Sequence, residues 1–259
     1  MTRYAIISDV HGNLTAFHAV LSRIAEIGVS RIVCLGDVVG YGPRPAACLE
    51  LVARHCHDVV RGNHEDALLD PRVATGFNGA ARQAIAWTAG RLTPAHTRWV
   101  GDLPAMAEVG PDRSVLCVHD CPVPGPTGYI HDRAVAAIAF RGVDLPVCLV
   151  GHTHVPVVFQ TAEPDPETPL TTSNLLRHRA EDGAAVVLEP GTRAICNPGS
   201  VGQPRDGDAR ASFATLEFLP DGGHAFTVHR VRYDVAAARR ELQAAGLPPV
   251  LGERLAIGA

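Results

Sequence analysis

Five short apolar runs in this sequence each end in residues of the kinds that bind metal ions. Carboxylate, imidazole and amide groups at the ends of neighbouring strands would meet at one edge of a sheet, as they do in α/β proteins. This placement is the strongest constraint on the fold. The five clusters are Asp9-Val10-His11, Gly36-Asp37, Gly62-Asn63-His64-Glu65, His119 and Gly151-His152-Thr153-His154.

The first hundred residues alternate between strand and helix patterns. Residues 62–65 are expected to form a turn, and the helical stretch over 66–101 to serve only in packing. Apolar residues at helical spacing, with Gly28 as a stop and Pro45 as a start, define the first two helices. The expected strands are Tyr4 to Ser8, Arg31 to Leu35 and Val59 to Arg61, and the expected helices are Leu14 to Ile27, Pro45 to His55, Asn78 to Arg91 and Thr93 to Gly101.

Short β-rich segments dominate from Met106 onward. The predicted class is α/β (α+β), with two mixed sheets packed face to face and helices outside, in one domain over residues 1–259. A polar insertion over about 162–183 is expected to be a lid or a disordered hairpin. The expected strands are Met106–Val109, Ser114–Val118, Pro146–Val150, Val155–Thr161, Ala184–Leu188, Ala194–Asn197, Ser212–Leu219 and His224–Arg232, with helices at Asp132–Arg141 and Val235–Ala245.

The net charge and the composition limit the kinds of partner that this chain is expected to bind. The net charge is −4, with no basic block that would suit a nucleic-acid backbone and no apolar run long enough for a membrane span. Seven cysteines, an odd number without a C-x-x-C pair, fit reduced thiols, so we expect a cytoplasmic protein. A cleaved signal peptide would also remove the first strand with Asp9 and His11. The pattern leaves the oligomeric state open.

The ligand types favour phosphoester hydrolysis at two divalent ions about 3.5–4 Å apart, which together activate one water. Asp37 follows a strand at a Gly-Asp turn and is the natural bridge. Asp9, His11 and one of the histidines at 152 and 154 would complete one ion, and Asn63, His119 and the other histidine the second. Oxygen and nitrogen ligands without thiolate favour Mn, Fe, Zn, Co or Ni, and we expect Mn. The imidazole of His64 is left free to act on a leaving group.

Taken in order, the five clusters resemble the signature blocks of the calcineurin-like metallophosphoesterases, over residues 4 to 232. The resemblance implies a four-layer αββα sandwich with a dimetal site at the sheet ends. It also implies that His64 protonates the leaving oxygen or stabilises its charge. By resemblance, one ion is held by Asp9, His11, Asp37 and His154, and the other by Asp37, Asn63, His119 and His152.

Departures from the family pattern indicate which branch of the family the chain resembles. Protein phosphatases and symmetrical dinucleoside tetraphosphatases follow the Gly-Asp pair with a second Asp and an Arg, which the stretch Gly36 to Gly42 lacks. The chain instead resembles small stand-alone prokaryotic phosphodiesterases, so we expect hydrolysis of small phosphodiesters. The alternatives are a phosphomonoesterase or protein phosphatase, and a metal-binding scaffold without catalysis. Asp120 stands where this branch commonly has glycine, and would place a carboxylate near the second ion.

Three further residues are candidates for contact with substrate. Asn13, Tyr41 and Arg205 could each touch the phosphoester, although turn and packing roles suit them equally. The loop from Asn197 to Gly207 is expected to border the site, with its glycine and serine N–H groups facing phosphate oxygens.

Overall fold

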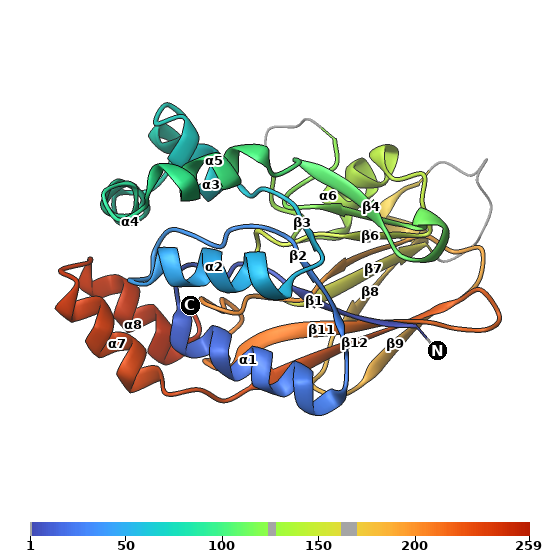
Figure 1. Cartoon of the computed structure of the whole chain (residues 1–259). Coiled ribbons are helices and arrows are strands. Elements are labelled where there is room, and N and C mark those ends of the chain that lie inside the picture. Colours follow the sequence, from blue (N-terminus) through green and yellow to red (C-terminus); the bar gives the residue numbers. More distant parts are fainter. Residues whose placement is uncertain (1, 124–127, 162–169) are drawn as a thin grey trace.

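The computed structural model describes residues 2–123, 128–161 and 170–259, and its strands form two six-stranded sheets (Figure 1). The first sheet runs in the order β3 (Asp58–Val59), β2 (Arg31–Cys34), β1 (Arg3–Ile7), β11 (Ala211–Phe218), β12 (His224–Val231) and β9 (Ala185–Leu188). The second runs in the order β4 (Met106–Val109), β5 (Val115–Val118), β6 (Val147–Leu149), β10 (Ala194–Asn197), β7 (Val157–Thr161) and β8 (Leu175–Arg179).

Helices cover the outer faces and one end of the paired sheets (Figure 1). The described helices are α1 (Leu14–Ile27), α2 (Pro45–His55), α3 (Asn63–Leu69), α4 (Gly79–Ala89), α5 (Pro94–Asp102), α6 (Arg133–Ala139), α7 (Val235–Ala244) and α8 (Pro249–Ile257). Short 3-10 turns include η1 (Val73–Gly76) and η4 (Thr172–Asn174).

The two-residue period of β1 explains the layers. Ile6 packs between the sheets against Leu149 of β6, whereas Ala5 and Ile7 face the other way and pack against Phe17 of α1. Each such fully buried aliphatic side chain contributes about 1.5–3 kcal/mol to folding. Phe159 makes the matching contact between the second sheet and α6. The predicted αββα sandwich is therefore confirmed.

The strand directions gather the ligand clusters. In the first sheet β1, β2 and β3 are parallel, and in the second sheet β5, β6 and β10 are parallel. The five clusters begin within three residues after the ends of β1, β2, β3, β5 and β6. Parallel strands end at a common edge, and the two packed sheets bring both edges to one place.

The expected turn over residues 62–65 is wrong, because α3 begins at Asn63. Gly62 is extended, with φ −98° and ψ 176°, and caps the helix, while the Glu65 carboxylate accepts its N–H at 2.9 Å. The Asp66 N–H closes the first helical turn on the Gly62 carbonyl at 3.0 Å, so the helix begins one residue after the glycine. The preceding strand is correspondingly shorter and earlier than predicted, at Asp58–Val59. Most other boundaries agree within one or two residues.

Two elements were missed. Part of the predicted polar insertion forms β8, an edge strand paired with β7, while residues 162–169 lie outside the described part of the chain. Helix α8 follows the last predicted helix and packs on α7 through Leu251 and Leu255. The four-residue spacing of Leu247, Leu251 and Leu255 was the available signal. Across the described residues, no helix combines the length and apolar character needed to cross a bilayer.

Candidate metal centre

The side chains at the strand ends are aimed inward by an unusual backbone. Asp9, His11, Asp37, His152 and His154 all have positive φ, between 48° and 65°. Left-handed conformation is rare for residues other than glycine, asparagine and aspartate, and it reverses the chain within one or two residues. The chain therefore turns sharply after β1, β2 and β6, and these side chains face one another.

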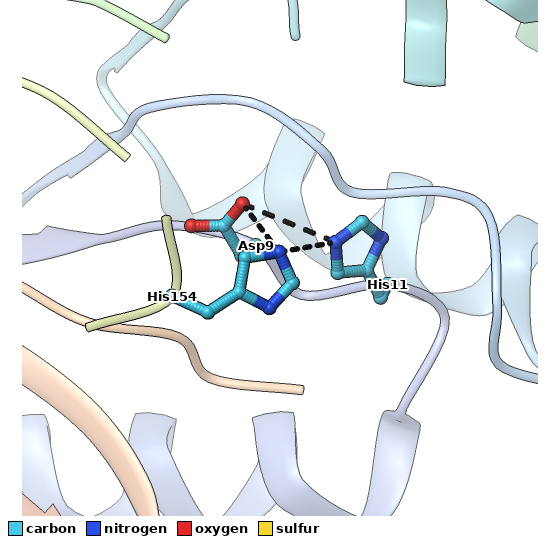
Figure 2. A group of neighbouring side chains, drawn as sticks. All are labelled: Asp9, His11 and His154. Carbon is cyan, nitrogen blue, oxygen red and sulfur yellow. Dashed lines mark hydrogen bonds and ion pairs between the residues drawn. The ribbon is translucent and has the colours of Figure 1, made fainter. Parts of the chain in front are cut away.

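Asp9, His11 and His154 form the first group (Figure 2). The Nε2 atoms of the two histidines lie 3.2 Å apart, and Asp9 Oδ1 lies 3.3 Å from Nε2 of His154 and 3.9 Å from that of His11. Asp9 is fully buried, and neither of its carboxylate oxygens has a hydrogen-bond partner among the described residues. A buried, unpartnered carboxylate beside two ring nitrogens is the environment that a cation would complete.

Asp37, His119 and His152 form the second group. Asp37 Oδ2 lies 3.3 Å from Nε2 of His119 and 3.6 Å from Nε2 of His11, so it faces both groups. The amide oxygen of Asn63 lies 3.1 Å from His119 Nε2. The other carboxylate oxygen of Asp37, Oδ1, accepts the N–H of His64 at 2.9 Å.

Three of the histidines are oriented by backbone carbonyls. The Nδ1 atoms of His11, His119 and His154 donate to the carbonyls of Val39, Leu35 and Gln203 at 2.9, 2.8 and 2.5 Å. A proton held on Nδ1 leaves the lone pair on Nε2, which is the usual arrangement of metal-bound imidazoles. The residues present therefore fit two adjacent divalent cations that share Asp37.

The pKa values of Asp9 and His119 also fit a site for cations. Burial raises the pKa of Asp9 to about 7. The charge of His119 opposes this rise, and the charge of Asp37 adds to it. Burial disfavours charge on His119, but the Asp37 carboxylate outweighs it and raises the pKa of His119 to about 10. The Asp37 carboxylate thus favours a second proton on the His119 ring. Ligand histidines must be neutral, so cation binding would release this proton.

A cavity of about 280 Å³ opens onto this edge. Its walls include the candidate ligands Asp37, Asn63, His152 and His154, and also His64, Tyr41, Tyr129, Arg205, Gly76, Phe77, Asn78 and Ala81. The expectation that residues 66–101 serve only in packing is therefore wrong, because η1 and the start of α4 form one wall. Tyr129 was also missed, since it lies in a loop without a periodic pattern.

Comparison with known proteins gives the family. Residues 2–220 match the calcineurin-like phosphoesterase superfamily domain. The chain belongs to the calcineurin-like phosphoesterase superfamily. An uncharacterized protein of Methanocaldococcus jannaschii, MJ0912, is 35% identical over 98% of this chain and 97% of its own length. The structure of a metallophosphoesterase from Sphaerobacter thermophilus superposes with a TM-score of 0.82 at 41% identity, covering 100% of this chain and 99% of that one.

A further relative matches a shorter stretch. The phosphodiesterase YfcE of Escherichia coli K12 is 38% identical over 73 residues, which are 24% of this chain and 40% of YfcE. The predicted superfamily is confirmed by the domain match and by the full-length relatives.

The side chain of His64 lies at the cavity wall, packed among other rings. Its ring contacts those of His11, Tyr41 and Phe77 at centroid distances of 4.7–4.8 Å. Its Nδ1 has no hydrogen-bond partner among the described residues, so no carboxylate orients it. This agrees with the absence of a second Asp from the stretch Gly36 to Gly42, where Gly40 lies directly against the His64 ring. Burial lowers the pKa of His64 to about 4, although Asp37 opposes the shift.

Of the three candidate substrate contacts, two line the cavity. The guanidinium of Arg205 donates to Tyr41 Oη at 3.3 Å and to Gln203 at 2.9 Å, and its buried Nε has no partner among the described residues. Asn13 is not among the lining residues. Its amide donates to the Gly202 carbonyl at 2.9 Å and its oxygen caps α1 at Ala16, which favours the turn role.

The loop over residues 197–207 borders the site, but for another reason than expected. Its carbonyl at Gln203 holds His154, and Ser200 donates its hydroxyl to the Asp9 carbonyl at 2.9 Å. The N–H groups of Gly199, Val201 and Gly202 all bond within the protein. The N–H groups of Gly199 and Gly202 are therefore not free for phosphate oxygens, and this loop holds the candidate ligands Asp9 and His154 in place instead.

Asp120 lies near the second group, as predicted. A Cβ built on Gly128 would lie 3.1 Å from Asp120 Oδ2 and 3.4 Å from His152 Nε2, so both side chains border this glycine. Burial raises the pKa of Asp120.

Glu65, for which the sequence pattern predicted no role, holds the loops of the centre together. Its fully buried carboxylate accepts four backbone N–H groups, those of Asp37, Val38, Val39 and Gly62, at 2.8–3.1 Å. It thereby ties the loop after β2 to the start of α3. The capping-box spacing from Gly62 was the available signal.

Replacing Glu65 tests this tie. Glu65→Gln turns one acceptor oxygen into an amide that faces two N–H donors, so we expect unfolding free energy to fall by about 3–5 kcal/mol. Urea denaturation of metal-free protein measures the change, and Glu108→Gln, at an exposed ion pair with Arg113, is the matched control. A change below about 0.5 kcal/mol would contradict a structural role for Glu65.

Proposed function

We propose that this protein is a metal-dependent phosphodiesterase that hydrolyses small phosphodiesters with two divalent cations, Mn being favoured. One cation would be held by Asp9, His11, Asp37 and His154, and the other by Asp37, Asn63, His119 and His152. The observation that carries the proposal is Asp37 Oδ2, which faces Nε2 atoms of both groups at 3.3 and 3.6 Å. When bound, such a cation pair activates a water molecule and neutralises the phosphoryl oxygens.

The remaining lining residues have roles that follow from their positions. Arg205 holds free donor capacity at the cavity wall and would bind a phosphoryl oxygen, supported by its contacts with Tyr41 and Gln203. The Nδ1 atom of His64 has no hydrogen-bond partner in the part of the chain that the structure describes, and this side chain would serve the leaving oxygen. As a neutral ring it donates an N–H bond to the developing charge, and beside the anionic phosphoester it is also better able to hold a transferable proton.

A diester is favoured over a phosphomonoester. The chain lacks the second Asp and the Arg that follow Gly-Asp in protein phosphatases, since the stretch Gly36 to Gly42 contains neither. The short match to YfcE, which is named a phosphodiesterase, is consistent with this choice. The scaffold alternative predicts loss of ligands, yet all seven proposed ligand side chains are present at the site.

Metal removal tests the activity. Protein stripped by a chelator should hydrolyse bis-p-nitrophenyl phosphate at least about 10³-fold more slowly than after Mn is restored, because several kcal/mol of transition-state stabilisation depend on the cations. p-Nitrophenyl phosphate and a phosphoserine peptide should be poorer substrates. A preference for the peptide would identify a protein phosphatase. Tight Mn binding without hydrolysis of any of the three would favour the scaffold.

A further inference from the structure

A second cavity, of about 350 Å³, adjoins the metal centre and has no role in the reaction described so far. Its apolar wall is made by Ile130, Val155 and Val157. Ile130 and Val157 are only 2% and 4% exposed and belong to the core between α6 and the second sheet. The surface they offer is therefore set by core packing, which suits a preformed site for an apolar group.

Tyr129 connects this cavity to the central one, because its ring lines both. The ring stacks on His152 with centroids 3.9 Å apart and planes at 29°. Thr153, which also lines the second cavity, stands between His152 and His154 in the chain. A group seated in the apolar cavity would thus lie next to the His152 side of the metal centre.

The two ester arms of a bound diester are distinguished by their neighbours. His64, which would serve the leaving oxygen, contacts Phe77 and Tyr41, whereas Tyr129 stacks on His152. The leaving arm therefore belongs beside His64 and Phe77. The other arm is left with Tyr129 and the apolar cavity as its neighbours.

We propose that this second cavity binds the ester group that stays on phosphorus, and that it selects an aromatic or bulky apolar group. The inference rests on the proposed phosphodiesterase function. Water adds its oxygen to phosphorus, the P–O bond to the leaving arm breaks, and that oxygen takes a proton. The bond to the retained arm stays intact, so the products are an alcohol and the phosphomonoester of the aromatic or apolar group.

Two substrates with one leaving group test the selection. With Mn-loaded protein, phenyl p-nitrophenyl phosphate should have a KM about tenfold or more below that of methyl p-nitrophenyl phosphate. Tyr129→Ala, which removes the stacked ring, should bring the two KM values to within about threefold. Val157→Phe, which fills the cavity, should do the same, and its thermal melting checks that it is folded. Phe77→Ala, on the leaving side, should keep the preference.

Product analysis tests the orientation. 2-Phenylethyl ethyl phosphate carries two alkoxide leaving groups of similar strength, so the site decides which one departs. We expect ethanol and 2-phenylethyl phosphate; 2-phenylethanol as the main product would overturn the assignment. Equal KM values for the phenyl and methyl esters would also overturn it while leaving the phosphodiesterase intact. No hydrolysis of either ester with Mn present would instead refute the proposed function.

Discussion

Asp37→Asn should lower metal content and activity together. Asparagine preserves the shape, tolerates the φ of 51°, and can still accept the His64 N–H through its oxygen. It removes the one negative charge that faces both His11 and His119. Because both cations would depend on that charge, we expect at least about a 10³-fold loss of kcat/KM on bis-p-nitrophenyl phosphate.

Metal analysis of the purified variant shows whether activity is lost because metal is lost. Bound Mn per protein should fall along with activity. Asp102→Asn, the same chemical change at the exposed end of α5, is the matched control and should retain both. If the Asp37 variant kept two equivalents of Mn, the shared-ligand role would be ruled out.

His64→Asn should instead keep the metals and lose turnover. A positioned group that protonates or hydrogen-bonds a leaving oxygen contributes about 10²–10⁴-fold to the rate. The loss should approach the upper value for an alkyl ester, whose alkoxide needs a proton, and should be much smaller for p-nitrophenolate. Kinetics on the two substrates, with metal analysis alongside, measures both parts of the prediction.

The matched control for His64 is His55→Asn, an exposed histidine at the end of α2. An equal loss on both esters would remove the leaving-group role. His64 also lies within ligand distance of His11 and Asp37 as a third cluster, so loss of Mn from the variant would make it a ligand.

The sequence predicted the layers and the meeting of the five clusters because both follow from local patterns. Strand periodicity places Ile6 and Ile7 on opposite faces, and parallel strand ends carry Asp9 and Asp37 to one edge. These rules need no knowledge of distant contacts.

The residues that escaped prediction depend on long-range packing. Phe77 belongs to a segment that looks like ordinary packing, and only the folded chain brings it within 4.7 Å of His64. Tyr129 reaches His152 from a loop whose residues show no period. For Asn13 the sequence suggested a contact with substrate, because this residue lies beside the first cluster. In the structure its side-chain oxygen caps α1 and its amide donates to the Gly202 carbonyl.

The left-handed backbone at Asp9, His11, Asp37, His152 and His154 has an evolutionary consequence. Each histidine or aspartate held there costs folding free energy, on the order of 1 kcal/mol, that glycine would not cost. Selection for metal binding must therefore act continuously against a tendency of these positions to drift toward glycine or asparagine. In a lineage released from that selection, glycine would relieve the backbone cost at each position, but at His11 and His154 it would also remove a buried side chain and its hydrogen bond to a backbone carbonyl.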